Sequence, residues 1–224
     1  MNEHNISNLT AFSSSGGCGC KLDPDYLKKI LGESGREVFS KNLLVGNLSN
    51  DDAAVYDLGD GTAIVNTTDF FTPIVDDPLS YGQIAATNAI SDIYAMGGTP
   101  LMALAILGWP KTKLSSDVAR TVLEGAQQVC RGINIDIAGG HSIECSEPIF
   151  GLSVVGRIKC NHIKTNNRAN IGDQVFLTKP LGTGLLTSAS QKSMLQSDDI
   201  SRAENMMKKI NSVGEVLGSL DVVS

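Results

Sequence analysis

Aspartates occur in this sequence at points where turns and strands are expected to meet. Asp51 and Asp52 follow the turn-rich stretch 46–50, and Asp69 comes after two threonines at the end of the next apolar run. Mg²⁺ binds a few carboxylates together with water and phosphate oxygens, so the group predicts a site for a metal and a phosphate ester. Each aspartate taken alone has a plainer interpretation, because carboxylates often cap turns or end strands.

Asn88 and Asp92 add two polar side chains to a stretch that is otherwise rich in Ala and Ile. Residues four apart lie on one face of a helix, so the two side chains should point the same way. A buried carboxylate without a partner is costly, and a divalent metal with phosphates would supply that partner. The alternative is that Asp92 pairs with an arginine.

A third feature is the run Cys18-Gly19-Cys20-Lys21, which ends a small polar arm. Two cysteines one residue apart make a poor zinc site without a second pair. A thiol near a lysine is typical of a reactive nucleophile or a soft ligand for a chalcogen, and the lysine can reach a phosphate as a point charge. The alternative is a tail with two exposed, inert thiols.

Two glycine-rich stretches complete the candidates. Residues 138–142 read Ala-Gly-Gly-His-Ser after a predicted strand, and such a turn lets backbone N–H groups approach an anion. A plain turn and a structural His141 are the alternatives. The stretch 179–184 lies near a lysine but lacks the Gly-Lys-Ser/Thr ending of a phosphate-binding P-loop.

The composition limits the class of protein. The chain has 224 residues, 42% apolar and 19% charged, with a formal net charge of -6; the acidic balance argues against non-specific nucleic-acid binding. Five irregularly spaced cysteines argue against a disulfide framework and for a reducing compartment. Neither a signal-like apolar segment at the start nor a membrane-length stretch is evident, so we expect a soluble, cytoplasmic protein without a nucleic-acid or membrane partner.

These residues need elements to position them. An aspartate that can cap a helix, followed by a proline, occurs at 23–24 and at 77–78, and each pair predicts the start of a helix. Alternating apolar residues on both sides of 59–61 predict a hairpin. Helices are expected at 24–31, 78–96, 116–131 and 201–217, and strands at 53–58, 62–67, 101–107, 133–138, 149–158 and 174–178. The expected units are an arm (1–22), an N-terminal domain (23–160), a linker (161–173) and part of a second domain (174–224).

Several of these motifs occur together, and in order, in one known family. The chain resembles bacterial selenophosphate synthetase in Gly17–Lys21, Asn42–Tyr56, Thr67–Phe71, Ala85–Gly98, Ile106–Pro110 and Ala138–Ser142. The Cys-Gly-Cys-Lys arm is the most diagnostic of them. Aminoimidazole ribonucleotide synthetase and thiamine monophosphate kinase share the aspartate-bearing core but lack that arm.

The resemblance implies a fold and a reaction. The fold class would be α+β, the two-domain architecture of the aminoimidazole ribonucleotide synthetase superfamily, in which the N-terminal sheets of two subunits join into a dimeric β-barrel. The second domain would be incomplete. The reaction would take ATP, selenide and water, with Mg²⁺, to selenophosphate, AMP and phosphate.

Roles carried over by position follow from the same resemblance. Cys18 would handle selenium, Lys21 would contact the nucleotide phosphates, and Cys20 has no role that we can argue. Asp52 and Asp92 would bind magnesium, with Asp92 also counted in the nucleotide site. The other nucleotide-site residues would be Ser49, Asn50, Asp51 and Asp69, together with Gly140, His141 and Ser142 from the partner subunit.

The sequence departs from the family in one respect. The family has a further metal-binding Asp in an Asp-Val-Thr-Gly-Phe-Gly segment, and this chain ends shortly before it by register; Asp221 lies too early to replace it. The expectation is a C-terminally truncated chain. Two alternatives stay open: an inactive nucleotide-binding or dimerising module, and another ATP-dependent enzyme of the same superfamily.

Overall fold

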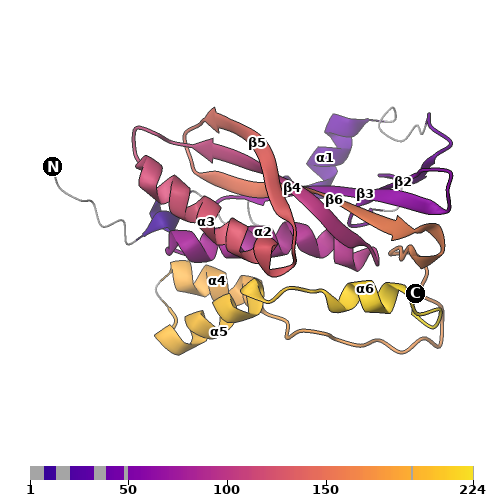
Figure 1. Ribbon diagram of the computed structural model, residues 1–224. Coiled ribbons are helices and arrows are strands. Elements are labelled where there is room, and N and C mark those ends of the chain that lie inside the picture. The colour runs from indigo at the N-terminus through magenta and orange to yellow at the C-terminus, as the bar shows by residue number, and fades with distance from the viewer. Residues whose placement is uncertain (1–7, 14–20, 33–38, 48–49, 193, 224) are drawn as a thin grey trace.

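The computed structural model describes residues 8–13, 21–32, 39–47, 50–192 and 194–223, and a six-stranded sheet forms its centre (Figure 1). The strand order is β1-β2-β3-β6-β4-β5, antiparallel except for the parallel pair β4 and β5. The strands are β1 Leu43–Val45, β2 Ala54–Asp57, β3 Thr62–Phe71, β4 Thr99–Trp109, β5 Asp136–Glu144 and β6 Ile149–Lys159.

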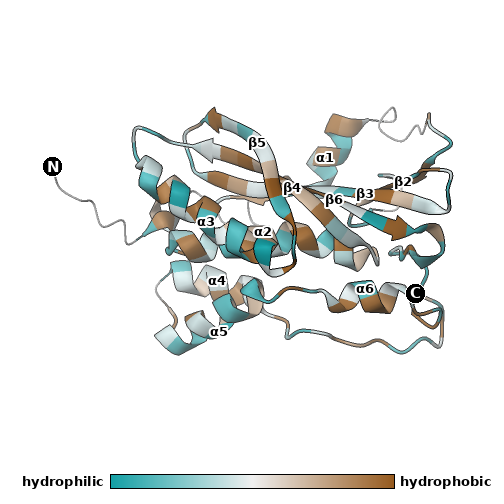
Figure 2. Ribbon diagram, viewed as in Figure 1, coloured by the Kyte–Doolittle hydropathy of each residue, from teal (hydrophilic) through white to brown (hydrophobic). Residues whose placement is uncertain are grey.

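Strand β3 shows why one face of this sheet is covered and the other is not. Ala63, Val65 and Phe71 are buried, whereas Phe70 between them is exposed. Alternate residues of a strand point to opposite faces, so the alternation marks a face packed against helices and an open face. Brown, apolar bands recur along the strands in Figure 2.

Helices α2 (Pro78–Ala95) and α3 (Ser116–Gly132) cover the packed face. The Asp77 side chain accepts a hydrogen bond from the Ser80 N–H at 2.8 Å and so caps α2. The two helices pack closely at Gly82 and Gly125, because a Cβ on Gly125 would lie 2.2 Å from the carbonyl oxygen of Leu79. A larger residue at either glycine would therefore push α2 and α3 apart.

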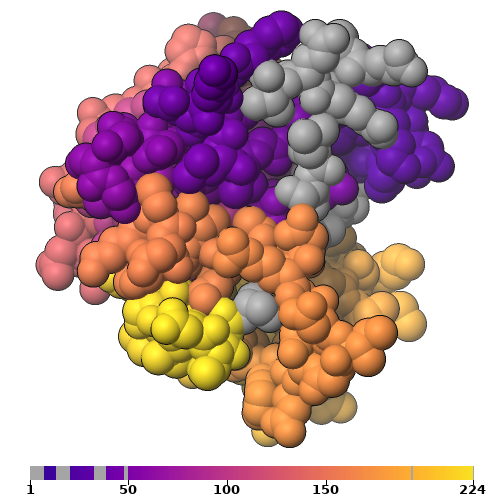
Figure 3. Space-filling model, turned by 90° about the vertical axis from the view of Figure 1, so that its right-hand side faces the viewer, coloured from indigo at the N-terminus to yellow at the C-terminus, as the bar shows by residue number. Residues whose placement is uncertain are grey.

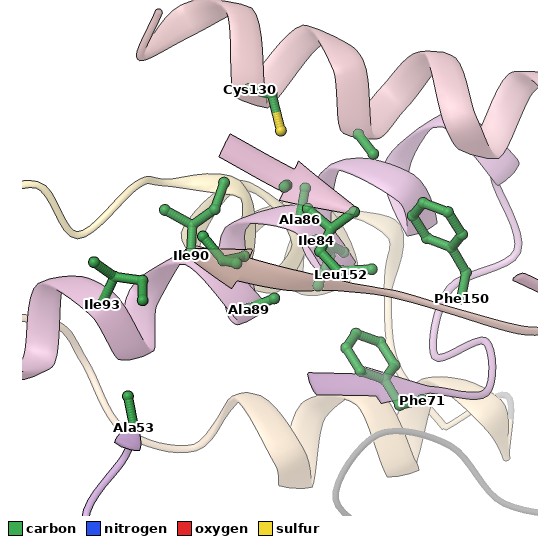
Figure 4. Packing of buried hydrophobic residues seen from close by; sticks show 14 of the residues in the cluster. Ala53, Phe71, Ile84, Ala86, Ala89, Ile90, Ile93, Cys130, Phe150 and Leu152 are labelled. Atoms are coloured by element: carbon green, nitrogen blue, oxygen red, sulfur yellow. The ribbon is translucent and has the colours of Figure 1, made fainter. Parts of the chain in front are cut away.

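The core lies between the sheet and these helices. Figure 4 shows Ile84 and Ile90 of α2 near Leu152 of β6, with Cys130 of α3 on the far side. The buried Tyr81 packs edge-on against Phe71, with ring centroids 5.9 Å apart, and its hydroxyl donates to a strand carbonyl. This packing fixes α2 against β3, which carries most of the candidate site.

The C-terminal part packs on the outer side of α2 (Figure 1). It contains α4 (Thr183–Gln191), α5 (Ser197–Lys208) and α6 (Val213–Gly218). Lys208 Nζ donates to Ser80 Oγ at 2.5 Å, and Asn211 Nδ2 donates to Ser91 Oγ at 2.7 Å. Polar contacts therefore hold this part against the helix that bears Asn88 and Asp92.

Most of the predicted elements are confirmed, and several are wrong. Helix α1 (Pro24–Leu31), the hairpin of β2 and β3, and helices α2 and α3 form as predicted. Short 3-10 turns occur at Leu9–Phe12 and Cys160–His162. The strand predicted at 133–138 starts later, the helix predicted at 201–217 is the two helices α5 and α6, and β1 and α4 were not predicted.

The strand predicted at 174–178 does not form. Val175 and Phe176 are 96% and 79% exposed, and the segment pairs with no strand in the described part of the chain. A strand is stable only when its N–H and C=O groups bond to a neighbour. The short apolar run Val175–Leu177 was present, but a strand there also needs a partner strand that the described residues do not supply.

Candidate nucleotide and metal site

Strand β3 and helix α2 bring the acidic residues together. Thr67 points from β3 toward α2 and donates from Oγ1 to Asp92 Oδ2 at 2.7 Å. The same hydroxyl lies 3.4 Å from the backbone oxygen of Asp52. Thr67 therefore joins the residues just before β2 to the last turn of α2, and it brings the two predicted metal ligands near one another.

Asp69 is held from two sides. Asn88, one turn before Asp92 on α2, donates from Nδ2 to Asp69 Oδ2 at 2.6 Å. Lys21 Nζ lies 3.8 Å from the same carboxylate oxygen, and its side chain is 62% exposed against 19% for Asp69. The lysine at the end of the N-terminal arm therefore reaches the acidic cluster.

The electrostatics of Asp92 show that these charges share one region. Burial raises the pKa of Asp92 to about 6, and the hydrogen bond from Thr67 opposes that rise. The charges of Asp69 and Asp52 raise the pKa further, and that of Lys21 lowers it. Asp92 is thus a half-buried acid whose ionised form is disfavoured by burial and by neighbouring negative charges. A bound cation would stabilise the ionised form.

The donor set fits a magnesium ion bound together with a phosphate ester. No group of three His, Cys, Asp or Glu side chains in the described ranges is compact enough to hold a metal ion on its own. Mg²⁺ is usually held by only one or two carboxylates and completes its octahedron with water and substrate phosphate oxygens. Asp52 and Asp92 match that limited requirement.

A cavity of about 480 Å³ adjoins the cluster. Asp69, Asn88 and Ser91 line one wall, and Lys179 and Thr183 of the C-terminal part line the other. Burial, followed by the charge of a neighbouring lysine, lowers the pKa of Lys179. Sequence analysis indicated this wall only weakly, through a lysine followed by glycines without a P-loop ending.

Asn50 and Asp51 face a different neighbour. Asn50 has a φ of 52°, in the left-handed region that few residues other than Gly and Asn adopt. Asp51 Oδ1 accepts from the backbone N–H of Asn166 at 2.6 Å, and Asn166 Nδ2 donates to the Asn50 carbonyl at 3.1 Å. The turn before Asp52 is therefore fastened to the segment that follows β6.

Gly140, His141 and Ser142 lie elsewhere. They belong to strand β5, paired with β4, rather than to the turn expected after a strand. They line a separate cavity of about 490 Å³, which Arg120 and Gln127 of α3 complete. Within one chain these three residues do not meet the aspartates. Cys18, Cys20 and Ser49 lie outside the described residues.

Comparison with known proteins shows what this chain is similar to. Residues 50–158 match the model of the AIR synthase related protein, N-terminal domain. The whole chain aligns with selenide, water dikinase from Escherichia coli strain K12 and from Shigella flexneri, at 51% identity over 223 residues in both cases. The chain is thus similar to selenide, water dikinases along its whole length, and it contains a region that matches the AIR synthase related N-terminal domain.

Solved structures of similar fold agree with this match. Thiamine monophosphate kinase from Aquifex aeolicus superposes with a TM-score of 0.67 at 19% identity, covering 89% of this chain and 64% of that one. The enzyme from Stenotrophomonas maltophilia gives 0.62 at 19% identity, covering 81% and 60%. The chain spans 64% of the length of the curated selenide, water dikinases.

The fold class expected from the sequence is thus confirmed as a mixed α and β fold of the AIR synthase type. The family model begins at Asn50, so it includes Asp52, Asp69 and Asp92 and ends with β6. The cavity wall formed by Lys179 and Thr183 lies after that region. In the described part of the chain, no helix is both long and apolar enough to cross a membrane.

Proposed function

We propose that this chain binds Mg²⁺ and ATP as the N-terminal part of a selenide, water dikinase. The reaction transfers a phosphoryl group from ATP to selenide and yields selenophosphate, AMP and phosphate, with water as the second acceptor. The 51% identity to proteins of that name supports the assignment. The observation that carries it is the half-buried Asp92, which lies among carboxylates and has its pKa raised to about 6.

The proposed roles follow the contacts. Asp52 and Asp92 hold Mg²⁺, which would neutralise phosphate charge during transfer. Thr67 fixes the orientation of the Asp92 carboxylate through its 2.7 Å hydrogen bond. Asn88 orients Asp69, and Lys21 exchanges its 3.8 Å contact with Asp69 for a nucleotide phosphate when ATP binds. Because phosphoryl transfer depends mainly on positioning and charge, such a set suffices for the nucleotide half of the reaction.

Cys18 is the proposed carrier of selenium. It precedes Lys21 by three residues, and three residues span at most roughly 11 Å. A thiol is a soft, polarisable group that can lie against selenide without forming an S–Se bond, so no oxidant is required. The lysine would bring the arm to the phosphates, and the thiol would deliver selenide there. We expect Cys18→Ser to lose selenide-dependent turnover and to keep nucleotide binding.

We further propose that two copies pair through the open face of the sheet. Phe70, Met102 and Leu104 are 46%, 42% and 41% exposed on that face, and exposed apolar patches on a sheet mark interaction sites. Pairing would let Gly140, His141 and Ser142 of each copy contribute to the nucleotide site of the other. Light scattering should give a dimer for the wild type and a monomer for Leu104→Lys.

One assay tests the proposed function. The chain is supplied anaerobically with ATP, Mg²⁺ and selenide, and AMP and selenophosphate are followed by ³¹P NMR, with a selenide-free reaction as control. AMP that forms only with selenide supports the dikinase. ADP formed with another acceptor would point to a different enzyme of the family, and ATP binding without turnover would point to a nucleotide-binding module.

A further inference from the structure

The turn that leads into Asp52, residues 50–51, is hydrogen-bonded to the segment 164–166, more than a hundred residues further along the chain. Asn166 makes two hydrogen bonds to this turn, one from its backbone N–H to Asp51 Oδ1 at 2.6 Å and one from its side-chain Nδ2 to the Asn50 carbonyl at 3.1 Å. Both hydrogen-bond acceptors belong to the two residues that precede Asp52. Figure 3 shows this segment, in orange, below the purple surface of the N-terminal part.

The turn contains a left-handed residue. Asn50 has a φ of 52°, which asparagine adopts more readily than most residues, and the two hydrogen bonds from Asn166 hold the turn in this conformation. Asp52 itself is exposed, and its backbone oxygen lies 3.4 Å from Thr67 Oγ1. The direction of the Asp52 carboxylate therefore depends on the two residues before it.

Asn166 is itself fixed by Lys164, two residues earlier. The Lys164 N–H donates to the Met96 carbonyl at 3.0 Å, at the end of α2. Lys164 Nζ donates to the Leu220 carbonyl at 3.0 Å, in the turn after α6. The segment is thus anchored to α2, which bears Asp92, and to the C-terminal part.

We propose that Asn166 is a positioning residue that sets the Asp52 carboxylate against Asp92. This rests on the proposed metal–nucleotide function and extends it, because it gives Asp51 and Asp52 different tasks. The Asp51 carboxylate accepts the hydrogen bond from the Asn166 N–H, whereas the charge of the Asp52 carboxylate acts on Asp92. Partners that orient metal-binding carboxylates commonly change metal affinity by 10- to 100-fold when they are removed.

The test measures metal affinity separately from stability. Mn²⁺, a substitute for Mg²⁺ that is visible by electron paramagnetic resonance, is titrated into the chain at saturating AMPPCP, a non-hydrolysable ATP analogue. Asn166→Ala removes the donor to the Asn50 carbonyl, and we expect it to weaken Mn²⁺ binding about 10-fold. Asn167→Ala is the matched control, since it removes a neighbouring amide side chain that accepts a hydrogen bond from Thr165 at 2.9 Å.

A purely structural role gives a different result. It would lower the urea midpoint of Asn166→Ala and leave Mn²⁺ affinity equal to that of Asn167→Ala, and that outcome overturns the inference. Asn166→Gln keeps an amide donor and should recover part of the affinity, which also provides a reading if the alanine variant folds poorly. A wild-type chain that binds neither AMPPCP nor Mn²⁺ would overturn the proposed function itself, and the inference with it.

Discussion

Replacing Asp92 by asparagine should stabilise the metal-free protein and abolish its metal binding. Burial, together with the charges of Asp69 and Asp52, disfavours the Asp92 carboxylate and raises its pKa to about 6 from 3.8. Asparagine is uncharged and still offers an oxygen to the Thr67 hydroxyl. The variant therefore keeps the local hydrogen bond and loses the unfavourable charge.

The size of the effect follows from linkage. One pKa unit corresponds to about 1.36 kcal/mol, so a rise to about 6 corresponds to at most about 3 kcal/mol. Between about pH 4 and 6 the folded chain keeps a proton on Asp92 that the unfolded chain has released, so wild-type stability falls as the pH rises through this window. Above pH 6 the penalty is constant. We expect Asp92→Asn to gain about 1–3 kcal/mol at pH 7.5, and little at pH 4.

Urea unfolding at several pH values in the presence of EDTA measures this gain. Asp221→Asn, an exposed aspartate in the last described turn, is the control for loss of one negative charge. An equal gain for both variants, or a gain for Asp92→Asn that does not shrink between pH 6 and pH 4, would refute the argument. In the same preparations Mn²⁺ binding should be lost for Asp92→Asn and kept for Asp221→Asn.

Three further predictions concern single sites. Gly125→Ala should destabilise the protein by about 1–3 kcal/mol, since its Cβ would meet a backbone oxygen at 2.2 Å. The control is Gly132→Ala, whose Cβ would meet nothing within 4 Å. Thermal unfolding should find this control neutral or slightly stabilised. Burial raises the pKa of the Cys130 thiol to about 11, so peptide mapping at pH 8 should find it unmodified by a thiol reagent until urea is added; modification in the folded protein would contradict this. Lys21→Ala should weaken AMPPCP binding about tenfold, as expected for loss of a charged hydrogen bond of about 1.5 kcal/mol; calorimetry with equal affinities for the variant and the wild type would exclude the phosphate contact.

The sequence predicted the elements whose signals are local. Asp77 before Pro78 marked the start of α2, and the four-residue spacing of Asn88 and Asp92 put both on the side that reaches β3. A cap, a proline and a helical period act within a few residues, so they can be recognised without knowledge of the rest of the fold.

Other features depended on distant partners. Asn166 meets Asp51 across 115 residues, and no spacing in the sequence indicates such a contact. The expected strand at 174–178 had a short apolar run typical of strands, but strand formation also requires a neighbouring strand to hydrogen-bond. The cavity wall at Lys179 arises only when the C-terminal part packs on α2. These features follow from packing rather than from local pattern.

The central claim is that Asp52 and Asp92 together hold a metal ion that carries a nucleotide. A crystal structure of the chain with Mn²⁺ and AMPPCP tests it most directly, because the anomalous signal of Mn²⁺ locates the metal. We predict a peak at coordination distance from both carboxylates, with the analogue phosphates on its other side. A well-bound analogue whose Mn²⁺ lies away from Asp92 would contradict the account.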